Sequence, residues 1–389
     1  MSSLTDTTAR SAETGAIRVT RSRRNVAWTG IVALVVVVVL AMFPYIVYSG
    51  TTTLLTQAFI VLVMASMWNL LAGYAGLVSV GQQGFVGLGA YGVLICSIHG
   101  ISPFLATPIA AIAAGVLAVP LWWLVSRLRT GYFAIATWVL ATVIMLVIEK
   151  FNSIGGGTGM PLGSIAGFDP TLLTADTYWS ALAVTVVALG GVYLVLRSRL
   201  GLTLTAIRDN EVAARSSGVR VGMARMLVFI IAAIGTGAAG AVLAIDQLQV
   251  QPSGVFDVGW TAKMAFAVII GGLGTIEGPI IGTAVYMILQ QTLQSYNAWY
   301  LIILGLVAMG IALFARRGLW GLVDDRFNLR LFPVGYYLWA PGETRRGRFG
   351  RPGRPGRPGR PGRTGRTGRK PAEPETPAPG DPSTPASRE

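Results

Sequence analysis

Long apolar segments separated by short polar connections make up most of this chain. Most are close to the roughly 20 residues that an α-helix needs to cross the hydrocarbon core of a bilayer. The pattern predicts an all-α, multi-pass membrane protein. Nine spans are one alternative, because Trp260–Leu273 is short, is flanked by glycines and can be a partial crossing. The full prediction is ten spans, at Val26–Val47, Thr52–Leu71, Val80–Ile98, Pro103–Val125, Tyr132–Ile148, Tyr178–Leu196, Met226–Ile245, Trp260–Leu273, Pro279–Leu293 and Trp299–Phe314.

The first apolar segment is predicted to be an uncleaved helix. A secretory signal peptide has a shorter apolar region followed by a small-residue cleavage site. Val26–Val47 is long enough to span the membrane. Residues 1–25 are therefore interpreted as a cytoplasmic tail, and residues 26–316 as the transmembrane domain.

Arginine and lysine gather on one side of this predicted bundle. With the N-terminus inside, the inner connections contain Arg127, Arg129, Arg316 and the whole segment Arg197–Arg225. The outer connections contain neither residue type; they are 49–51, 154–176 and 247–259. Short cytoplasmic loops carry an excess of these cations. The distribution predicts that both termini are cytoplasmic.

Composition agrees with a membrane location and excludes several classes of site. The chain is 53% hydrophobic and 12% charged, whereas soluble domains carry about 25% charged residues. One cysteine and one histidine exclude a disulfide framework and a metal site built from those residues. The phosphate-binding pattern G-x-x-x-x-G-K-[ST] is absent as well. We therefore expect no metal and no cofactor in this chain.

The C-terminal part is predicted to lie outside the membrane. Residues 317–341 are rich in aromatic residues but carry Asp324, Asp325 and Arg326, which favours a stretch at the inner interface. Residues 342–389 contain Arg-Pro-Gly repeats and are predicted to be disordered. Half of the net charge of +14 lies in this tail, where Glu343 to Glu389 hold twelve basic and five acidic residues. Anionic lipids are a possible partner of these cations, and a nucleic-acid-binding surface is not indicated.

The segment Arg197–Arg225 is the one strongly charged loop inside the apolar region, with six arginines and two acidic residues. Asn210 is a good helix cap, Glu211 can pair with Arg215 one turn later, and Gly218 can end the helix in a left-handed conformation. Ala213 and Ala214 leave one side of this short helix shallow. The helix either docks on another protein or merely connects two spans, and length and charge alone do not separate these readings.

A family resemblance separates them. The pattern Glu211-x-Ala213-Ala214-x-x-x-Gly218 resembles the E-A-A-x-x-x-G signature of ABC importer permeases, and IRDNEVAARSSGV resembles that of branched-chain amino acid (LIV-type) permeases. Three glycine-rich stretches are similar to the same family: Gly73–Gly92, Gly131–Gly159 and Gly271–Gly282. The likeness runs from about Thr52 to Trp320 and is closer to the LivM-type subunit than to the LivH-type subunit. Gln82-Gln83 stand where many relatives have Gly-His or Gly-Gln.

The resemblance implies a permease subunit of an ATP-driven importer in a bacterial plasma (inner) membrane, without catalysis of its own. Its implied partners are two ABC ATPase subunits that bind the ATP, a second, LivH-like permease subunit and an extracytoplasmic substrate-binding protein. The implied cargo is branched-chain or other hydrophobic amino acids. The implied coupling residues are Arg208, Asn210, Glu211, Ala213, Ala214 and Gly218.

A few polar residues at membrane depth are candidates for the translocation pathway. Glycines that recur between Gly73 and Gly92 permit close helix packing or a broken helix beside a cavity. Polar side chains in spans often only join helices, and Lys263 can instead reach the outer interface. Packing is the favoured reading for the glutamines, and interface anchoring for the lysine. The candidates are Tyr74, Ser79, Gln82, Gln83 and Lys263.

Other functions fit the sequence less well. An ion- or proton-coupled secondary transporter normally needs ionisable groups inside its spans, but Glu149 and Asp246 lie at predicted span ends. A membrane enzyme would need paired carboxylates, a metal set or an activated nucleophile, and none is evident. Similar permeases carry urea, amides or other small solutes, so the cargo stays open.

Overall fold

The structure, a computed structural model, describes residues 18–20, 23–46, 49–128, 130–163, 169–293, 299–314, 318–327 and 337–339. The chain divides into two compact units, residues 20–337 and residues 1–19 with 338–389. Of residues 1–19 and 338–389, the structure describes only parts of two short strands, β1 (Arg18–Thr20) and β4 (Tyr337–Trp339). These strands pair with each other, and one residue of each, Thr20 and Tyr337, belongs to the larger unit. The predictions for residues 1–17 and 342–389 fall outside the described residues, as does most of the segment 328–341.

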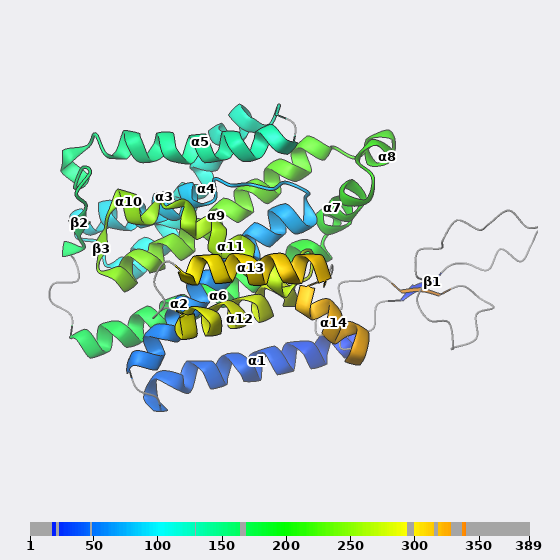
Figure 1. Cartoon of the computed structure of the whole chain (residues 1–389), viewed down its shortest axis with the longest axis horizontal. Helices are drawn as coiled ribbons and strands as arrows, with labels where there is room; N and C mark the ends of the chain where they lie inside the picture. The colour runs from blue at the N-terminus through cyan, green and yellow to red at the C-terminus, as the bar shows by residue number, and fades with distance from the viewer. Residues whose placement is uncertain are drawn as a thin grey trace, which may run out of the picture. The chain divides into compact units, whose positions relative to one another are not determined.

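The larger unit is a helical bundle (Figure 1). Its long apolar helices are α1 (Arg23–Ile46), α2 (Ser49–Asn69), α3 (Gln83–Ile98), α4 (Pro103–Val125), α5 (Thr130–Ile148), α6 (Pro170–Arg197) and α9 (Val221–Gln247). After them come the short α10 (Pro252–Val255), then α11 (Val258–Gly271), α12 (Glu277–Leu293), α13 (Trp299–Phe314) and α14 (Gly318–Phe327). Strands β2 (Met160–Pro161) and β3 (Gln249–Val250) form a small antiparallel ladder, with a 3₁₀ turn, η2 (Asn152–Ile154), before β2.

The helices confirm the all-α, multi-pass class. Six helical segments are long and apolar enough to cross a membrane: Gly50–Tyr74, Pro103–Val125, Gly131–Ile148, Leu172–Arg197, Val221–Gln247 and Pro252–Gly271. Three shorter apolar helices lie at Gly30–Ile46, Gln83–Ile98 and Ile302–Ile311. Among the described residues, Glu277–Leu293 falls in neither group, so the number of ten spans and the side of each terminus stay predictions.

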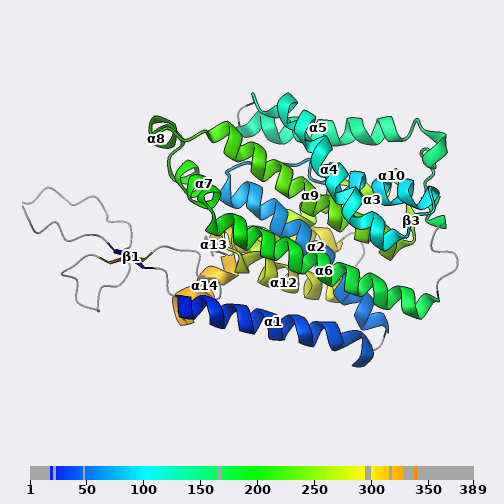
Figure 2. The ribbon, with the colours of Figure 1, turned by 180° about the vertical axis from the view of Figure 1, so that it is seen from behind.

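Helices α2 and α9 form the centre of the bundle. Both are largely buried, whereas α5 is mostly exposed and presents large apolar side chains such as Trp138, Val139 and Val143 to its surroundings. Seen from both sides, α1 and α5 lie along opposite edges (Figures 1 and 2). An α-helix satisfies its own backbone hydrogen bonds, so an exposed apolar helix at the edge of the bundle can face lipid.

Glycines set the crossing of α3 with α9, as the sequence predicted for close packing. A Cβ added at Gly89 would collide with the carbonyl of Gly237, and one added at Gly240 would collide with the carbonyl of Val86. The two backbones touch because these positions carry no side chain, which is the usual role of small residues between membrane helices.

The connection from α2 to α3 is a broken helix. Helix α2 passes into a π-helical turn, η1 (Leu70–Tyr74), and residues 75–82 are irregular before α3 begins at Gln83. Most of this irregular segment is buried among other helices; Ala75, Leu77 and Ser79 are almost fully inaccessible. Non-helical backbone at membrane depth is tolerated where protein surrounds it. A π-turn is rare and often marks a functional position.

The eighth predicted span has a short helix. Helix α11 has 14 residues, which corresponds to about 21 Å at 1.5 Å per residue, less than the roughly 30 Å of a hydrocarbon core. Together with α10 the segment Pro252–Gly271 reaches 20 residues, but it is interrupted at Phe256 and Asp257. A discontinuous span of this kind can border a binding cavity.

Candidate functional site

The charged loop forms two short helices at one end of the bundle. Helix α7 (Arg199–Asp209) and helix α8 (Glu211–Ser216) lie at the end opposite β2 and β3 (Figures 1 and 2). Ser198 caps α7 by accepting a hydrogen bond from the Leu200 N–H at 3.1 Å. Four residues separate the end of α8 from the start of α9, a central helix of the bundle.

Both ends of α8 are fixed in the way that the sequence predicted. At its start, Asn210 Oδ1 accepts a hydrogen bond from the Ala213 N–H at 3.0 Å. At its end, Gly218 has φ +81°, its N–H donates to the Arg215 carbonyl, and the Val219 N–H donates to the Ala214 carbonyl. These two bonds form a Schellman motif, which requires a left-handed residue at the Gly218 position.

Helix α8 has one buried and one exposed side. Ala214 is buried in a small apolar cluster with Ile207, Val221 and Ala224, so it holds the helix onto the rest of the loop. Ala213 is exposed, and the neighbouring Val212 exposes 74% of its surface. The two alanines therefore lie on different sides of the helix, and the surface open to a partner is the one around Val212 and Ala213.

Glu211 joins α8 to the start of α9. Its Oε1 accepts a hydrogen bond from Arg215 Nη2 at 2.7 Å, and its Oε2 accepts one from Arg225 Nη2 at 2.9 Å. Arg225 Nε lies 3.5 Å from the Ala75 carbonyl oxygen, just after the π-turn η1. The Arg225 side chain is only 19% exposed. One arginine on α9 therefore connects the end of α2 with α8.

The pKa of Glu211 is lowered, first by the hydrogen bond from Arg215 and then by the bond from Arg225, while partial burial acts in the opposite direction. A carboxylate with a lowered pKa contributes stability above its unfolded pKa, and this contribution is lost as the pH falls through the folded value. We therefore expect both ion pairs to persist at neutral and weakly acidic pH.

Arg208 gives α7 a second connection with the bundle. Its guanidinium lies against Gly274, in the turn between α11 and α12. Asn69 holds that turn from α2, since its Oδ1 accepts from the Gly274 N–H at 2.8 Å and its Nδ2 donates to the Thr275 carbonyl at 2.8 Å. Tyr74 lies close enough to Arg208 to interact with its charge.

Glu277, the first residue of α12, is buried, with 7% of its surface exposed. The glycine-rich turn before it folds against the end of α2, where Glu277 lies near Tyr74. Loop composition carries no information about such a contact.

The polar residues before and at the start of α3 are buried and mostly engaged with their neighbours. Gln82 Oε1 accepts from Thr236 Oγ1 at 2.9 Å, and Gln83 Oε1 accepts from Thr261 Oγ1 at 2.5 Å. Ser79 Oγ accepts from the Gly81 N–H at 3.3 Å. The glutamines link α3 to α9 and α11, which agrees with the packing interpretation. Within the described residues, Gln82 Nε2 has no hydrogen-bond partner.

Lys263 lines a cavity in the bundle, and its interpretation as an interface anchor stays a prediction. The cavity has a volume of about 310 Å³ and lies between α2, α9, α11 and α12. The Lys263 Nζ lies 3.9 Å from the centre of the Trp260 ring. Asp246 borders the same cavity, although the sequence placed it only at a span end.

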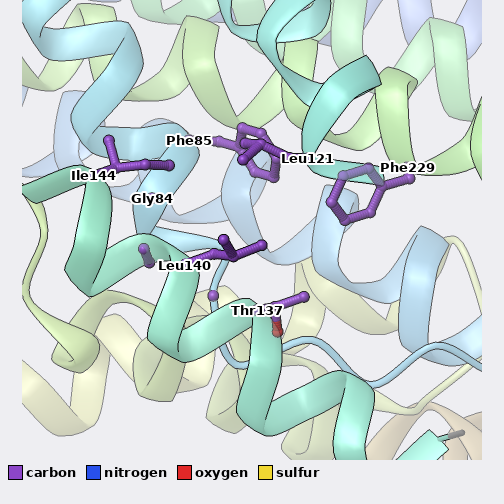
Figure 3. Close-up of a pocket in the computed structure, with 9 residues that line it drawn as sticks. Gly84, Phe85, Leu121, Thr137, Leu140, Ile144 and Phe229 are labelled. Atoms are coloured by element: carbon purple, nitrogen blue, oxygen red, sulfur yellow. The ribbon is translucent and has the colours of Figure 1, made fainter. Parts of the chain in front are cut away.

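A second, much smaller gap lies between α3, α4, α5 and α9 (Figure 3). Its volume of about 20 Å³ is close to that of one water molecule. Phe85, Leu121, Leu140 and Phe229 point toward it, and Thr137 is one polar lining residue (Figure 3). The size and apolar lining are those of a packing gap between helices.

Comparison with known proteins decides the class of this bundle. A family model described as a permease component of a branched-chain amino acid transport system matches residues 50–315. The chain belongs to this family. The match covers every described helix from α2 to α13 and confirms the predicted role as a permease subunit of an ABC importer. The family is one of transport proteins.

Individual relatives agree with the family model. The permease is 25% identical over 325 residues to the high-affinity branched-chain amino acid transport system permease protein LivM of Escherichia coli K12, and the alignment covers 76% of each chain. The LivM protein of Salmonella typhimurium LT2 is 24% identical over 324 residues. A probable LivH permease of Methanocaldococcus jannaschii is 25% identical over 234 residues, or 56% of this chain and 71% of the relative.

Two residues of the candidate site were missed by sequence reasoning. Arg225 was counted among the charges of the loop but was given no role, and Asp246 was set aside as a span-end residue. A signal existed for Asp246, because it is the one acidic residue of the 27-residue helix α9, and ionisable residues in membrane helices are often functional. For Arg225, no local pattern indicates a bond to Glu211.

Proposed function

We propose that this permease moves branched-chain or related hydrophobic amino acids inward across a bacterial plasma membrane, and that ATPase subunits drive it by docking on α8. The permease itself carries no catalytic role in this proposal. ATP-dependent closure of the ATPases moves α8, and the bundle then changes between outward and inward access.

The observation that carries the coupling role is the anchorage of α8. A six-residue helix would not persist alone in water, yet α8 is capped at both ends and tied to Arg225 through Glu211. Its outer side, with Val212 exposed, is left open. This combination of a fixed base and a free apolar surface suits a helix that fits into a groove of another protein.

We take the subunits of the proposed assembly from the family to which the chain belongs. It contains two ATPase subunits, a second permease subunit of LivH type and an extracytoplasmic binding protein that delivers the cargo. The cytoplasmic location of α7 and α8 follows from the arginine distribution. The membrane-depth residues Tyr74, Ser79, Gln82, Gln83 and Lys263 remain proposed pathway residues.

Reconstitution tests the proposal against a secondary transporter. We expect leucine uptake into proteoliposomes to require this permease, its partner permease, both ATPases, the binding protein and internal ATP. A proton gradient without ATP should give no uptake. Uptake by this chain alone under a proton gradient would contradict the ABC mechanism and favour the secondary transporter.

Replacing Gly218 with valine should strongly reduce ATP-driven uptake. The residue has φ +81°, a conformation that costs an ordinary L-residue about 1–2 kcal/mol and a β-branched one more. The Schellman motif would open and α8 would lose its orientation. The measurement is the initial rate of uptake, normalised to the amount of permease in the membrane.

Gly222→Val is the matched control for this substitution. Gly222 lies in the first turn of α9, has space for a Cβ and has no left-handed backbone. Its valine variant should keep most of the uptake. Equal losses in the G218V and G222V variants would indicate that bulk on the loop, and not the end of α8, is responsible.

A further inference from the structure

The cavity at the far end of α9 brings a cation and an anion into one space. Asp246, near the C-terminal end of α9, and Lys263, in the second turn of α11, both border it, together with the amide side chains of Gln57 and Gln290. Both charged residues are partly buried. The cavity lies at the end of the bundle away from α8, since α9 runs from Val221 beside α8 to Gln247.

Within the described residues, these two charges do not neutralise each other. The salt bridges there involve only Glu211 with its two arginines. Lys263 places its ammonium over the Trp260 ring at 3.9 Å and lies within electrostatic range of Asp257, while Asp246 interacts with the Gln57 side chain. A partly buried charge without a salt-bridge partner is costly in a bundle of this kind. Two separated, opposite charges facing one cavity are suited to a ligand that itself carries both signs.

Apart from Gln247 and Trp260, the remaining wall of the cavity is aliphatic. It is formed by Ile60 and Val61 of α2, Leu243 of α9 and Met287 of α12. The volume of about 310 Å³ lies at the lower end of the range for small-molecule sites. A ligand with a charged head and a short hydrocarbon side chain would satisfy both parts of the lining.

We propose that this cavity is a binding site for zwitterionic amino acids with apolar side chains, in which Lys263 receives the α-carboxylate and Asp246 the α-ammonium group. Gln57 supplies a further hydrogen bond, and the apolar wall contacts the side chain. The proposal rests on the proposed function, because it names the place where the transported class of substrate first binds the permease.

Protection of an introduced cysteine from alkylation by bound leucine tests the site without relying on transport. Cys96 is the one cysteine of the chain, so Cys96→Ser gives a cysteine-free background. In this background Gln290→Cys places a thiol in the cavity wall. Gln249→Cys is the matched control, because Gln249 is exposed, lies just beyond the same end of α9 and is absent from the cavity lining.

We expect leucine to slow alkylation of the Q290C thiol in the reconstituted full complex. At ten times the half-saturating concentration, about one site in eleven is free, so alkylation should slow about elevenfold. The Q249C thiol should react at the same rate with and without leucine. Two analogues test the need for both charges: 4-methylpentanoate lacks the amino group and 3-methylbutylamine lacks the carboxylate, and neither should protect.

Substitution of the charged residues completes the test. Asp246→Asn or Lys263→Met, each combined with Q290C, should abolish protection by leucine while the protein remains folded and inserted. Protection that survives both substitutions, or equal protection by 4-methylpentanoate, would overturn the assignment of the two charges. No protection by leucine together with normal ATP-driven uptake would overturn the site and leave the proposed function standing.

A zwitterionic lipid headgroup offers the same pair of charges and is distinguished by the choice of bilayer. Alkylation of Q290C without leucine is compared in vesicles of phosphatidylethanolamine and in vesicles of phosphatidylglycerol. Equal rates in the two bilayers, with leucine still protective, are the expected result. Protection by phosphatidylethanolamine that leucine does not increase would assign the cavity to lipid and overturn the proposal.

Discussion

Replacing Glu211 with arginine should abolish ATP-driven leucine uptake while the permease still inserts and folds. The substitution removes the hydrogen bond to Arg225 and places a third cation beside Arg215 and Arg225. The exposed Glu211–Arg215 pair contributes little, about 0.3–0.5 kcal/mol for an i,i+4 contact. The greater effect comes from Arg225, whose side chain is 19% exposed and is left beside a like charge.

ATP-driven uptake should be lost completely because α8 would no longer be connected to α9. Glu211 is the residue through which α8 contacts Arg225 and, beyond it, the Ala75 carbonyl. Without that contact, a displacement of α8 by an ATPase is taken up by the loop. We expect uptake at the level measured without ATP, with unchanged amounts of permease in the membrane and an unchanged elution profile in detergent.

Two variants separate this reason from a general effect of charge. Asp209→Arg makes the same change of charge at an exposed residue two positions earlier and should retain most of the uptake. The double variant with Glu211→Arg and Arg225→Glu should recover part of it, because the pair is restored with reversed sign. Normal uptake by the E211R variant would remove Glu211 from the coupling mechanism.

Replacing Gly89 with leucine should prevent stable assembly of the bundle. The Cβ of any larger residue at this position would overlap the Gly237 carbonyl, so α3 has to move away from α9. Excess volume in a packed interior costs about 1–3 kcal/mol and sometimes more, and here the obstacle is a backbone atom that a rotamer change does not move. We expect a strongly reduced yield of monodisperse protein and a lower thermal midpoint in detergent.

Gly190→Leu is the control for Gly89→Leu. Gly190 lies in the part of α6 that is long and apolar enough to cross a membrane, but a Cβ there meets no atom within 4 Å. This variant should match the wild-type yield and thermal midpoint. If G89L were as stable as G190L, the α3–α9 crossing would have to be looser than the structure shows.

The sequence predicted α8 well because all of its determinants lie within nine residues. Asn210 caps the helix, Glu211 pairs with Arg215, and Gly218 ends it. Each of these is a local rule of helix formation. The positions of the long apolar helices were predicted for a similar reason, since the length of an apolar run is read directly from the sequence.

Contacts between distant segments were not predictable in this way. Gln83 contacts Thr261, 178 positions away in the sequence, and Asp246 lines the same cavity as Lys263 only because α9 and α11 pack near the same end.

The burial of Ala214 left a usable signal in the sequence, since Ile207, Ala214 and Val221 recur every seven residues and form one cluster. The π-turn at Leu70–Tyr74 left no signal that distinguishes it from an α-helix.

Helix α9 joins the two proposed sites as a single uninterrupted rod. Arg225 near its start holds α8 through Glu211, and Asp246 near its end borders the cavity; 21 residues at 1.5 Å separate them by about 32 Å. Two ligands that act on the same equilibrium of one element affect each other's binding by the same factor. The factor by which bound ATPase changes leucine binding in the cavity therefore equals the factor by which leucine changes the affinity for the ATPase, whichever element carries the coupling. A loss of this coupling factor in the E211R variant, in which α8 loses its bond to Arg225 on α9, would show that the coupling passes through this helix.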